Sequence, residues 1–152
     1  MRPVAETKEF PGQVRTVPDL EDWMSQLDSA GYFAEAEALA FVGPPVPIGR
    51  EWRLFVVDGN IVSTSQYACA GEKAVASGCP ENVQRYGQTI LDIYRPAECC
   101  VLDVAEVESD AGSSLKCVEF NSINSAGFYL ADVGIIVDAL SRYACKCVGC
   151  PT

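Results

Sequence analysis

Hydrophobic and polar residues alternate along the middle of the chain in a pattern that predicts β-strands. Residues 51–57 and 61–67 alternate with a period of two and flank Asp58-Gly59-Asn60, a turn sequence typical of a β-hairpin. Two further apolar runs, 99–107 and 115–120, are separated by turn-rich residues and predict a second hairpin. The period of two places alternate side chains of each strand on opposite faces of a sheet.

Three segments repeat their apolar residues at the spacing of an α-helix and predict helices that pack on the strands. The first begins at Pro18 and ends before Gly31, the second covers residues 80–95, and the third covers residues 128–144. The helical residues expected to face the core are Leu20, Trp23, Met24, Leu27, Val83, Tyr86, Ile90, Ile93, Tyr94, Leu130, Val133, Ile136, Val137 and Leu140.

The connecting segments are predicted from small and turn-forming residues. Residues 43–47 contain three prolines and are expected to form a hinge or linker. Loops are expected at residues 71–78 and 122–127. Before the first helix we expect a strand, a loop at residues 8–12 and a second short strand, and another short strand is expected at residues 38–42.

Two acids and an amide fall on the second hairpin, whose strands are otherwise apolar. If this hairpin is centred near Ala111, Asp103 faces Glu119 across the strands, and Asn121 shares a face with Glu119. Two carboxylates about 4 Å apart repel by roughly 4 kcal/mol at an effective dielectric constant near 20. A divalent cation would offset this repulsion, because carboxylate and amide oxygens suit Mg²⁺ or Mn²⁺. The alternative is that Asp103 is simply exposed on a solvated face.

Composition narrows the classes of partner. The chain has 152 residues, of which 49% are hydrophobic, enough for one globular domain with a core. The formal net charge of −10 argues against nucleic acid and anionic membranes as partners. Met1 leads into polar residues rather than a signal peptide, and no apolar stretch approaches the length of a membrane span, so we expect a cytoplasmic protein.

The eight cysteines divide into those of the predicted strands and those near the C-terminus. Without a secretion signal a disulfide framework is not expected. Near the C-terminus, Cys145, Cys147 and Cys150 could bind zinc with Cys79 as a fourth thiolate, or they could be loose thiols. The strand cysteines are expected to be small buried hydrophobes, namely Cys69, Cys99, Cys100 and Cys117.

An ordered series of short motifs runs through residues 1–144. In chain order the series is Arg2-Pro3, Lys8, Gly12, Glu51-Trp52-Arg53, Asp58-Gly59, Leu102-Asp103-Val104, Glu119-Phe120-Asn121, Gly127-Phe128-Tyr129 and Asp132. In this order and spacing the motifs resemble the ATP-grasp superfamily of carboxylate–amine ligases, most closely its compact bacterial and phage amidoligase-like clade. The resemblance implies an α+β fold, with a mostly antiparallel sheet and helices packed on one face.

The resemblance also implies a division into three parts. Residues 1–45 would be a remnant of the N-terminal ATP-grasp subdomain that grips the nucleotide. Residues 46–144 would be the C-terminal subdomain with the metal site, followed by a Cys-rich tail at residues 145–152. The domain that usually precedes these parts in the family has no counterpart ahead of Met1, so we expect a truncated N-terminal part. An incomplete sheet edge there favours a homo-oligomer, or a partner chain that supplies the missing part.

Roles for the candidate residues follow from the same resemblance. Asp103, Glu119 and Asn121 would hold Mg²⁺ or Mn²⁺ against the β- and γ-phosphates of ATP. Arg53 would also act in catalysis together with Lys8, although an arginine on a strand is often only a surface charge or one half of a salt bridge. The residues expected to bind the nucleotide are Arg2, Lys8, Gly12, Val42, Glu51 and Arg53.

The expected reaction joins a carboxylate to an amine. ATP would phosphorylate the carboxylate, and an amine would then displace phosphate from the acyl-phosphate to form an amide. Asn124, Ser125 and Gly127 would lie beside the reacting carboxylate, whereas Ser65 and Tyr67 would either touch substrate or pack within the sheet. Two alternatives remain at this point: a non-catalytic nucleotide-binding remnant or scaffold, and a zinc-binding interaction protein.

Overall fold

The structure is a computed structural model that divides into two compact units, Met1–Pro45 and Val46–Thr152. The boundary falls within residues 43–47, where the prolines predict a linker. The residues that the structure describes are 2–3, 14–30, 40–110 and 112–149.

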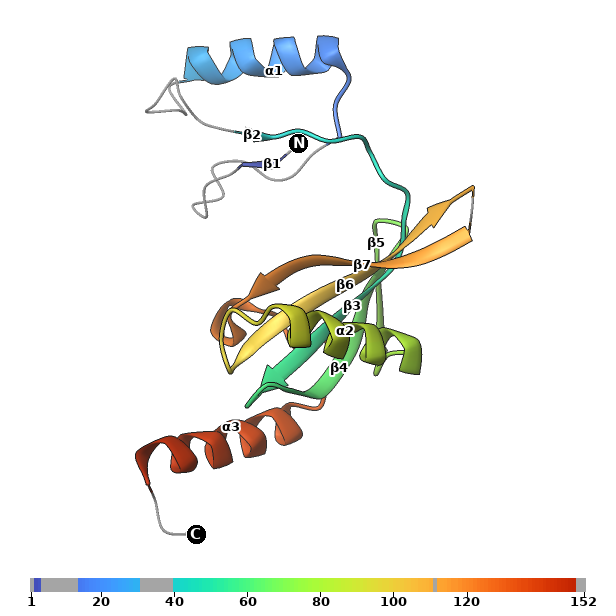
Figure 1. The fold of residues 1–152 in the computed structure, drawn as a ribbon. Coiled ribbons are helices and arrows are strands. Elements are labelled where there is room, and N and C mark those ends of the chain that lie inside the picture. The colour runs from blue at the N-terminus through green and yellow to red at the C-terminus, as the bar shows by residue number, and fades with distance from the viewer. Residues whose placement is uncertain (1, 4–13, 31–39, 111, 150–152) are drawn as a thin grey trace. The chain divides into compact units, whose positions relative to one another are not determined.

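The first unit contains one described helix and a small antiparallel sheet. Strand β1 (Arg2–Pro3) pairs with β2 (Ala40–Phe41). Helix α1 (Val17–Ala30) begins where the sequence predicts it (Figure 1). Its first turn is capped reciprocally, because the Thr16 hydroxyl accepts from the Asp19 amide at 3.3 Å while the Asp19 carboxylate accepts from the Thr16 amide at 3.3 Å.

The second unit is built on a five-stranded antiparallel sheet with the strand order β5-β4-β3-β6-β7 (Figure 1). Both predicted hairpins are confirmed: β3 pairs with β4, and β6 pairs with β7. Strand β3 lies at the centre because it also pairs with β6. The strands are β3 (Ile48–Val57), β4 (Asn60–Cys69), β5 (Glu72–Ser77), β6 (Cys100–Ser109) and β7 (Gly112–Asn121).

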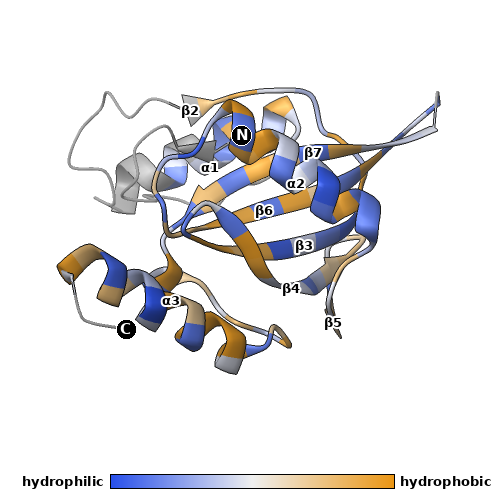
Figure 2. Ribbon diagram, turned by 60° about the horizontal axis from the view of Figure 1, so that its bottom comes forward, coloured by the Kyte–Doolittle hydropathy of each residue, from blue (hydrophilic) through white to orange (hydrophobic). Residues whose placement is uncertain are grey.

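Helices cover both faces of this sheet (Figure 2). Helix α2 (Glu81–Ile93) packs on one face with a cluster that includes Trp52 and Leu54. Helix α3 (Val133–Val148) and the segment before it pack on the other face, where Ile136 meets Phe55. The predicted α+β fold with a mostly antiparallel sheet is confirmed. The helices do not share one face, however, because even and odd positions of β3 are both apolar and both faces need covering.

The segment between Cys69 and Cys79 differs from the prediction, because it forms an edge strand rather than a loop. Strand β5 pairs with β4, with Ala76 opposite Gln66. The Gln66 side-chain amide also donates to the Ala74 carbonyl at 3.0 Å. Small residues therefore form a strand here, since the neighbouring strand supplies both backbone and side-chain hydrogen bonds.

Helix α3 begins five residues later than predicted and runs beyond Ala144. Tyr129 has a φ of 52°, outside the helical region, and the Asp132 side chain caps the helix by accepting from the Ile135 amide at 3.0 Å. Of the predicted core stripe, Ile136 is buried and Leu140 is half-buried. About half of the surface of the other three side chains is exposed, which applies to Leu130, Val133 and Val137.

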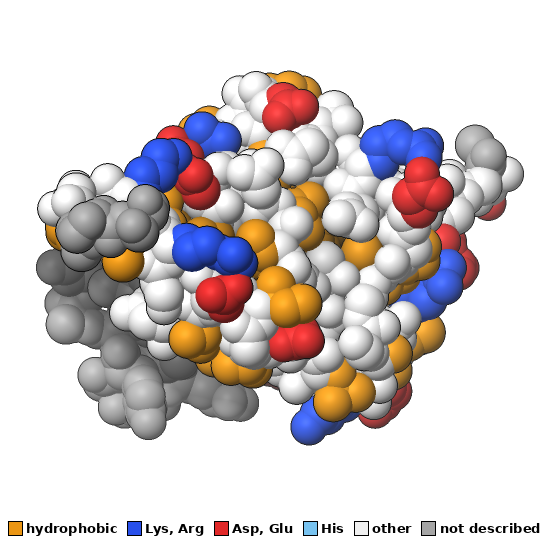
Figure 3. All heavy atoms as spheres, turned by 90° about the horizontal axis from the view of Figure 1, so that it is seen from below, with side chains coloured by type: hydrophobic (Ala, Val, Ile, Leu, Met, Phe, Trp, Pro, Cys, Tyr) orange, Lys and Arg blue, Asp and Glu red, His pale blue; other side chains and the backbone are white. Residues whose placement is uncertain are grey.

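Apolar side chains are accordingly scattered among charged ones on the face of the molecule in Figure 3. Within the described ranges, no helix has the length and apolar character needed to cross a membrane.

Candidate functional site

Four polar side chains lie in one row across the middle of the sheet. Ser65 on β4 is opposite Arg53 on β3, Arg53 is opposite Asp103 on β6, and Asp103 is opposite Glu119 on β7. Directly opposed residues point to the same face of a sheet, so the row lies on the face away from α2. The predicted register, with Asp103 facing Glu119, is confirmed.

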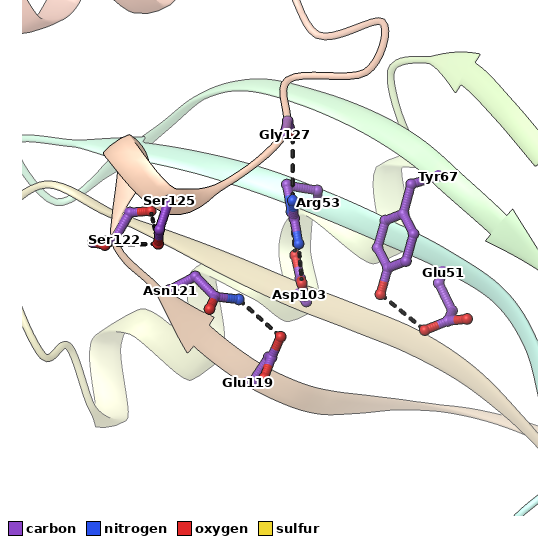
Figure 4. A network of polar contacts seen from close by, with 9 residues as sticks. All are labelled: Glu51, Arg53, Tyr67, Asp103, Glu119, Asn121, Ser122, Ser125 and Gly127. Atoms are coloured by element: carbon purple, nitrogen blue, oxygen red, sulfur yellow. Dashed lines mark hydrogen bonds and ion pairs between the residues drawn. The ribbon is translucent and has the colours of Figure 1, made fainter. Parts of the chain in front are cut away.

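Arg53 and Asp103 form a two-pronged ion pair at the centre of this row (Figure 4). Arg53 Nε donates to Asp103 Oδ1 at 2.9 Å, and Arg53 Nη2 donates to Oδ2 at 2.7 Å. The Asp103 side chain is 2% exposed and the Arg53 side chain is 11% exposed, so the alternative of a solvated Asp103 is wrong. The hydrogen bonds to Asp103 raise the pKa of Arg53. The paired geometry fixes the plane of a fully charged guanidinium.

Glu119 and Asn121 extend the acidic end of the row along β7. Asn121 Nδ2 donates to Glu119 Oε1 at 2.9 Å, and both side chains are half-buried (Figure 4). In the part of the chain that the structure describes, no group of three or more His, Cys, Asp or Glu side chains could hold a metal. A cation here would therefore need the amide oxygen of Asn121 beside the two carboxylates, which is a donor set suited to Mg²⁺ or Mn²⁺.

The loop before α3 and β4 together hold the other side of the Arg53 guanidinium. Arg53 Nη1 donates to the Gly127 carbonyl at 3.2 Å. The guanidinium carbon lies 5.4 Å from the ring centroid of Tyr67 and 5.4 Å from that of Tyr129. The two rings stack on each other with centroids 5.4 Å apart and planes inclined by 17°. Five groups therefore surround one guanidinium: two carboxylate oxygens, a carbonyl and two aromatic rings.

The Tyr67 ring is itself held in place by Glu51. The Tyr67 hydroxyl donates to Glu51 Oε2 at 2.8 Å (Figure 4). Burial raises the pKa of Tyr67, and the neighbouring carboxylates raise it further. The phenol therefore stays protonated and keeps its hydrogen bond to Glu51 throughout the physiological pH range.

Two serines on β4 pin the loop to the sheet. The Ser65 hydroxyl is fully buried, accepts from the Leu130 amide at 3.2 Å and donates to the Ala76 carbonyl at 2.9 Å. The Ser63 hydroxyl accepts from the Asp132 amide at 2.8 Å. These contacts help to explain why the loop leaves the helical conformation, because the amides of Leu130 and Asp132 bond to side chains of β4 instead of to preceding carbonyls.

Each residue of the motif Gly127-Phe128-Tyr129 makes a different contact with the sheet. Gly127 offers its carbonyl to Arg53, Phe128 stacks on Phe55 with ring centroids 5.2 Å apart, and Tyr129 stacks on Tyr67. The sequence singled out this motif but assigned no role to Tyr129. The missing signal is the left-handed backbone of Tyr129, which no local pattern of residue types reveals.

The predicted substrate positions lie at the end of β7. Asn124 and Ser125 belong to a short 3₁₀ turn, η1 (Ile123–Ser125), and both are exposed. The Ser125 hydroxyl lies 2.8 Å from the Ser122 hydroxyl (Figure 4). The structure thus brings Gly127 to Arg53 through a hydrogen bond to its carbonyl, while Asn124 and Ser125 lie earlier in the same loop.

The remaining predicted nucleotide-binding residues belong to the first unit. Arg2 lies in β1 opposite Phe41, and Val42 follows β2 and is 72% exposed. Lys8 and Gly12 lie outside the described residues.

The cysteines near the C-terminus do not gather into a zinc site among the described residues. Cys145 and Cys147 are exposed on α3, where residues two positions apart do not face each other. Cys79 is half-buried, and burial raises its pKa, while Cys150 lies outside the described residues. The expectation that Cys117 is buried is wrong, because β7 is an edge strand and leaves this side chain exposed.

Comparison with known proteins identifies a family for this chain. The family model described as ATP-grasp domain, R2K clade family 3, matches residues 1–141. No curated protein and no solved structure matches the chain. The matched residues span both units and include the whole row on the sheet and the loop that holds Arg53.

Proposed function

Because the chain belongs to the ATP-grasp superfamily, in family 3 of the R2K clade, we propose that it is an ATP-dependent carboxylate–amine ligase acting through an acyl-phosphate. One observation supports this most strongly: a buried, bidentate Arg53–Asp103 pair lies beside Glu119 on the face of the sheet away from α2. Phosphoryl transfer depends on positioning and charge neutralisation more than on covalent chemistry, and this row offers both.

We assign the divalent cation to Asp103, Glu119 and Asn121. When bound, Mg²⁺ or Mn²⁺ would neutralise the phosphates of ATP. Arg53 donates to both oxygens of Asp103 in the structure, so a cation at Asp103 would compete with the guanidinium for these oxygens. Arg53 would then stabilise the negative charge that develops on the transferring phosphoryl group and on the acyl-phosphate.

The other candidate residues complete the site in this proposal. Nucleotide contacts would come from Glu51 and from the first unit, while the loop after β7 would border the reacting carboxylate. The acidic net charge of −10 favours small substrates over nucleic acid, and the need for ATP favours the cytoplasm. The residues assigned to nucleotide, catalysis and substrate, beyond the metal set, are Arg2, Lys8, Gly12, Val42, Glu51, Arg53, Asn124, Ser125 and Gly127.

The proposed reaction consists of two successive displacement steps. A carboxylate oxygen attacks the γ-phosphorus of ATP, the bond to the β-phosphate oxygen breaks, and ADP leaves. The amine nitrogen then attacks the acyl carbon, the bond to the phosphate oxygen breaks, and phosphate leaves as the nitrogen loses a proton. In both steps negative charge develops near the position of Arg53, where preorganised donors are most effective.

Hydroxylamine trapping tests this function. The full chain is incubated with ATP, Mg²⁺, hydroxylamine and pools of small carboxylates, and ADP and hydroxamate are both measured. We expect Mg²⁺-dependent formation of ADP that requires a carboxylate and is matched by an equal amount of hydroxamate. Binding of ATP without turnover on any carboxylate would favour a non-catalytic nucleotide-binding protein. A chain that does not bind ATP would contradict the proposal.

A further inference from the structure

The Arg53 guanidinium is held more elaborately than its ion pair with Asp103 requires. A bidentate carboxylate already satisfies two of its donors, yet two aromatic rings and a carbonyl also contact it. The rings come from elements far apart in sequence, since Tyr67 lies on β4 and Tyr129 lies in the loop before α3. We propose that Tyr67 and Tyr129 form a two-ring clamp that positions Arg53 for the γ-phosphate of ATP.

The clamp matters most when the cation is bound. This inference rests on the proposed function, in which a cation would compete with Arg53 for the oxygens of Asp103. The remaining contacts of the guanidinium are then the Gly127 carbonyl and the faces of Tyr67 and Tyr129. Aromatic faces attract a guanidinium without consuming its hydrogen-bond donors. The donors that Asp103 releases are therefore available for phosphate oxygens while the rings keep the guanidinium plane in place.

Each ring of the clamp is fixed independently of Arg53. Glu51 holds the Tyr67 hydroxyl at 2.8 Å. Tyr129 adopts a φ of 52°, a conformation unfavourable for a bulky residue, and Ser65 fixes the next amide, that of Leu130, at 3.2 Å. Because both rings are already held in place, little side-chain conformational entropy is lost when ATP binds.

Core packing alone does not account for Tyr129. Tyr129 is 42% exposed, so the burial of its ring is incomplete, yet the residue occupies a strained backbone position. Its contacts with Tyr67 and Arg53 are the interactions that favour this placement. We therefore assign Tyr129 as a positioning residue, which acts on the phosphate through Arg53 and does not touch the reacting atoms.

Two substitutions at Tyr129 separate the effect of its aromatic ring from the effect of its backbone conformation. Tyr129→Phe keeps the aromatic face, whereas Tyr129→Asn removes it but keeps a residue that tolerates the left-handed conformation. Tyr94→Leu serves as the control, because Tyr94 is 61% exposed at the end of α2 and stacks edge-on with Phe120 instead. Thermal unfolding of each variant reports whether the fold is retained.

The measurement is the ratio of the affinities for Mg²⁺–ATP and Mg²⁺–ADP, obtained by isothermal titration of the full chain. Because the clamp acts on the γ-phosphate contact, Tyr129→Asn should lower the affinity for ATP roughly threefold to tenfold more than the affinity for ADP. Tyr129→Phe and Tyr94→Leu should leave the ratio unchanged. If the wild type binds ATP and Tyr129→Asn keeps the wild-type ratio, the clamp is refuted while the proposed function stands. A wild type that binds no ATP overturns both.

Discussion

Arg53 and Asp103 bury opposite charges on one face of the sheet, and this makes each residue dependent on the other. Removal of one partner from a buried ion pair typically costs about 3–5 kcal/mol, whereas replacement of both by apolar residues is often tolerated. The Arg53 side chain is 11% exposed, so water relieves part of this cost and the lower end of the range applies.

We therefore predict that Arg53→Met lowers the free energy of unfolding by about 3 kcal/mol at neutral pH. The double variant Arg53→Met/Asp103→Leu should recover most of that loss. Urea denaturation measures both values. The matched control is Arg85→Met, because Arg85 pairs with Glu81 on the surface and its loss should change stability by less than about 1 kcal/mol. Equal destabilisation in the single and double variants would show that loss of the ion pair is not the cause of the lower stability.

At this scale the sequence predicted contacts within a hairpin better than contacts between hairpins. The turn near Ala111 and the period of two were enough to place Asp103 opposite Glu119. The partnership of Arg53 with Asp103 requires knowing that β3 lies beside β6, and 50 residues separate the two positions. Strand order depends on packing of the whole sheet, so no local pattern predicts it.

Helix α2 approaches the sheet closely at one glycine, and this element depends on the absence of a side chain there. The helical pattern alone marks Gly87 as a weak point of the helix. In the structure Gly87 is buried, and a Cβ at this position would collide with Leu54 Cδ2 and lie 3.2 Å from Ile61 Cδ1. The glycine is therefore required for packing of the helix on the sheet.

We predict that Gly87→Ala destabilises the protein by about 1–3 kcal/mol, although alanine is the better helix former. The control Thr89→Ala lies on the exposed side of the same helix and should be neutral or slightly stabilising. Chemical denaturation of the two variants provides the comparison. A Gly87→Ala protein as stable as the wild type would mean that the helix stands further from the sheet than described.

The loop before α3 is a second element held by one buried group. Ser65→Ala removes the acceptor of the Leu130 amide, and an unsatisfied buried amide costs about 1–3 kcal/mol. We expect faster hydrogen exchange at residues 126–132 in this variant. Ser113→Ala, at the exposed tip of the β6–β7 hairpin, should leave exchange in that loop unchanged. Wild-type exchange rates in Ser65→Ala would show that the serine does not pin the loop.

Elements with strong local signals were predicted well, and elements fixed by distant groups were not. Both hairpins follow from alternation and turn residues, and α1 follows from its apolar spacing and from Pro18 at its start. The late start of α3 depends on Ser63 and Ser65, which bond the amides of the preceding loop from β4. Strand β5 likewise depends on hydrogen bonds from Gln66 and Ser65 rather than on its own small residues.

For the molecule as a whole, an acidic chain places a single arginine at the centre of the row, between Ser65 and Asp103. The net charge is −10, yet Arg53 is mostly buried at the centre of the row. The matching family model covers residues of both units, and membership in the family supports an ATP-dependent activity at the level of the superfamily. The substrate-binding details stay a matter of proposal, because they depend on the loop after β7 and on residues of the first unit.

The central claim is that Glu119 belongs to the site that binds ATP with a divalent cation. Isothermal titration of Mg²⁺–ATP into the wild type, Glu119→Gln and Glu108→Gln tests it directly. Glu119→Gln keeps the shape of a half-buried side chain and removes one carboxylate from the cation, so affinity should fall at least about tenfold. Glu108 is exposed in the same hairpin, and Glu108→Gln should bind as the wild type does. Equal affinities in all three proteins, or no binding by any of them, would contradict the account.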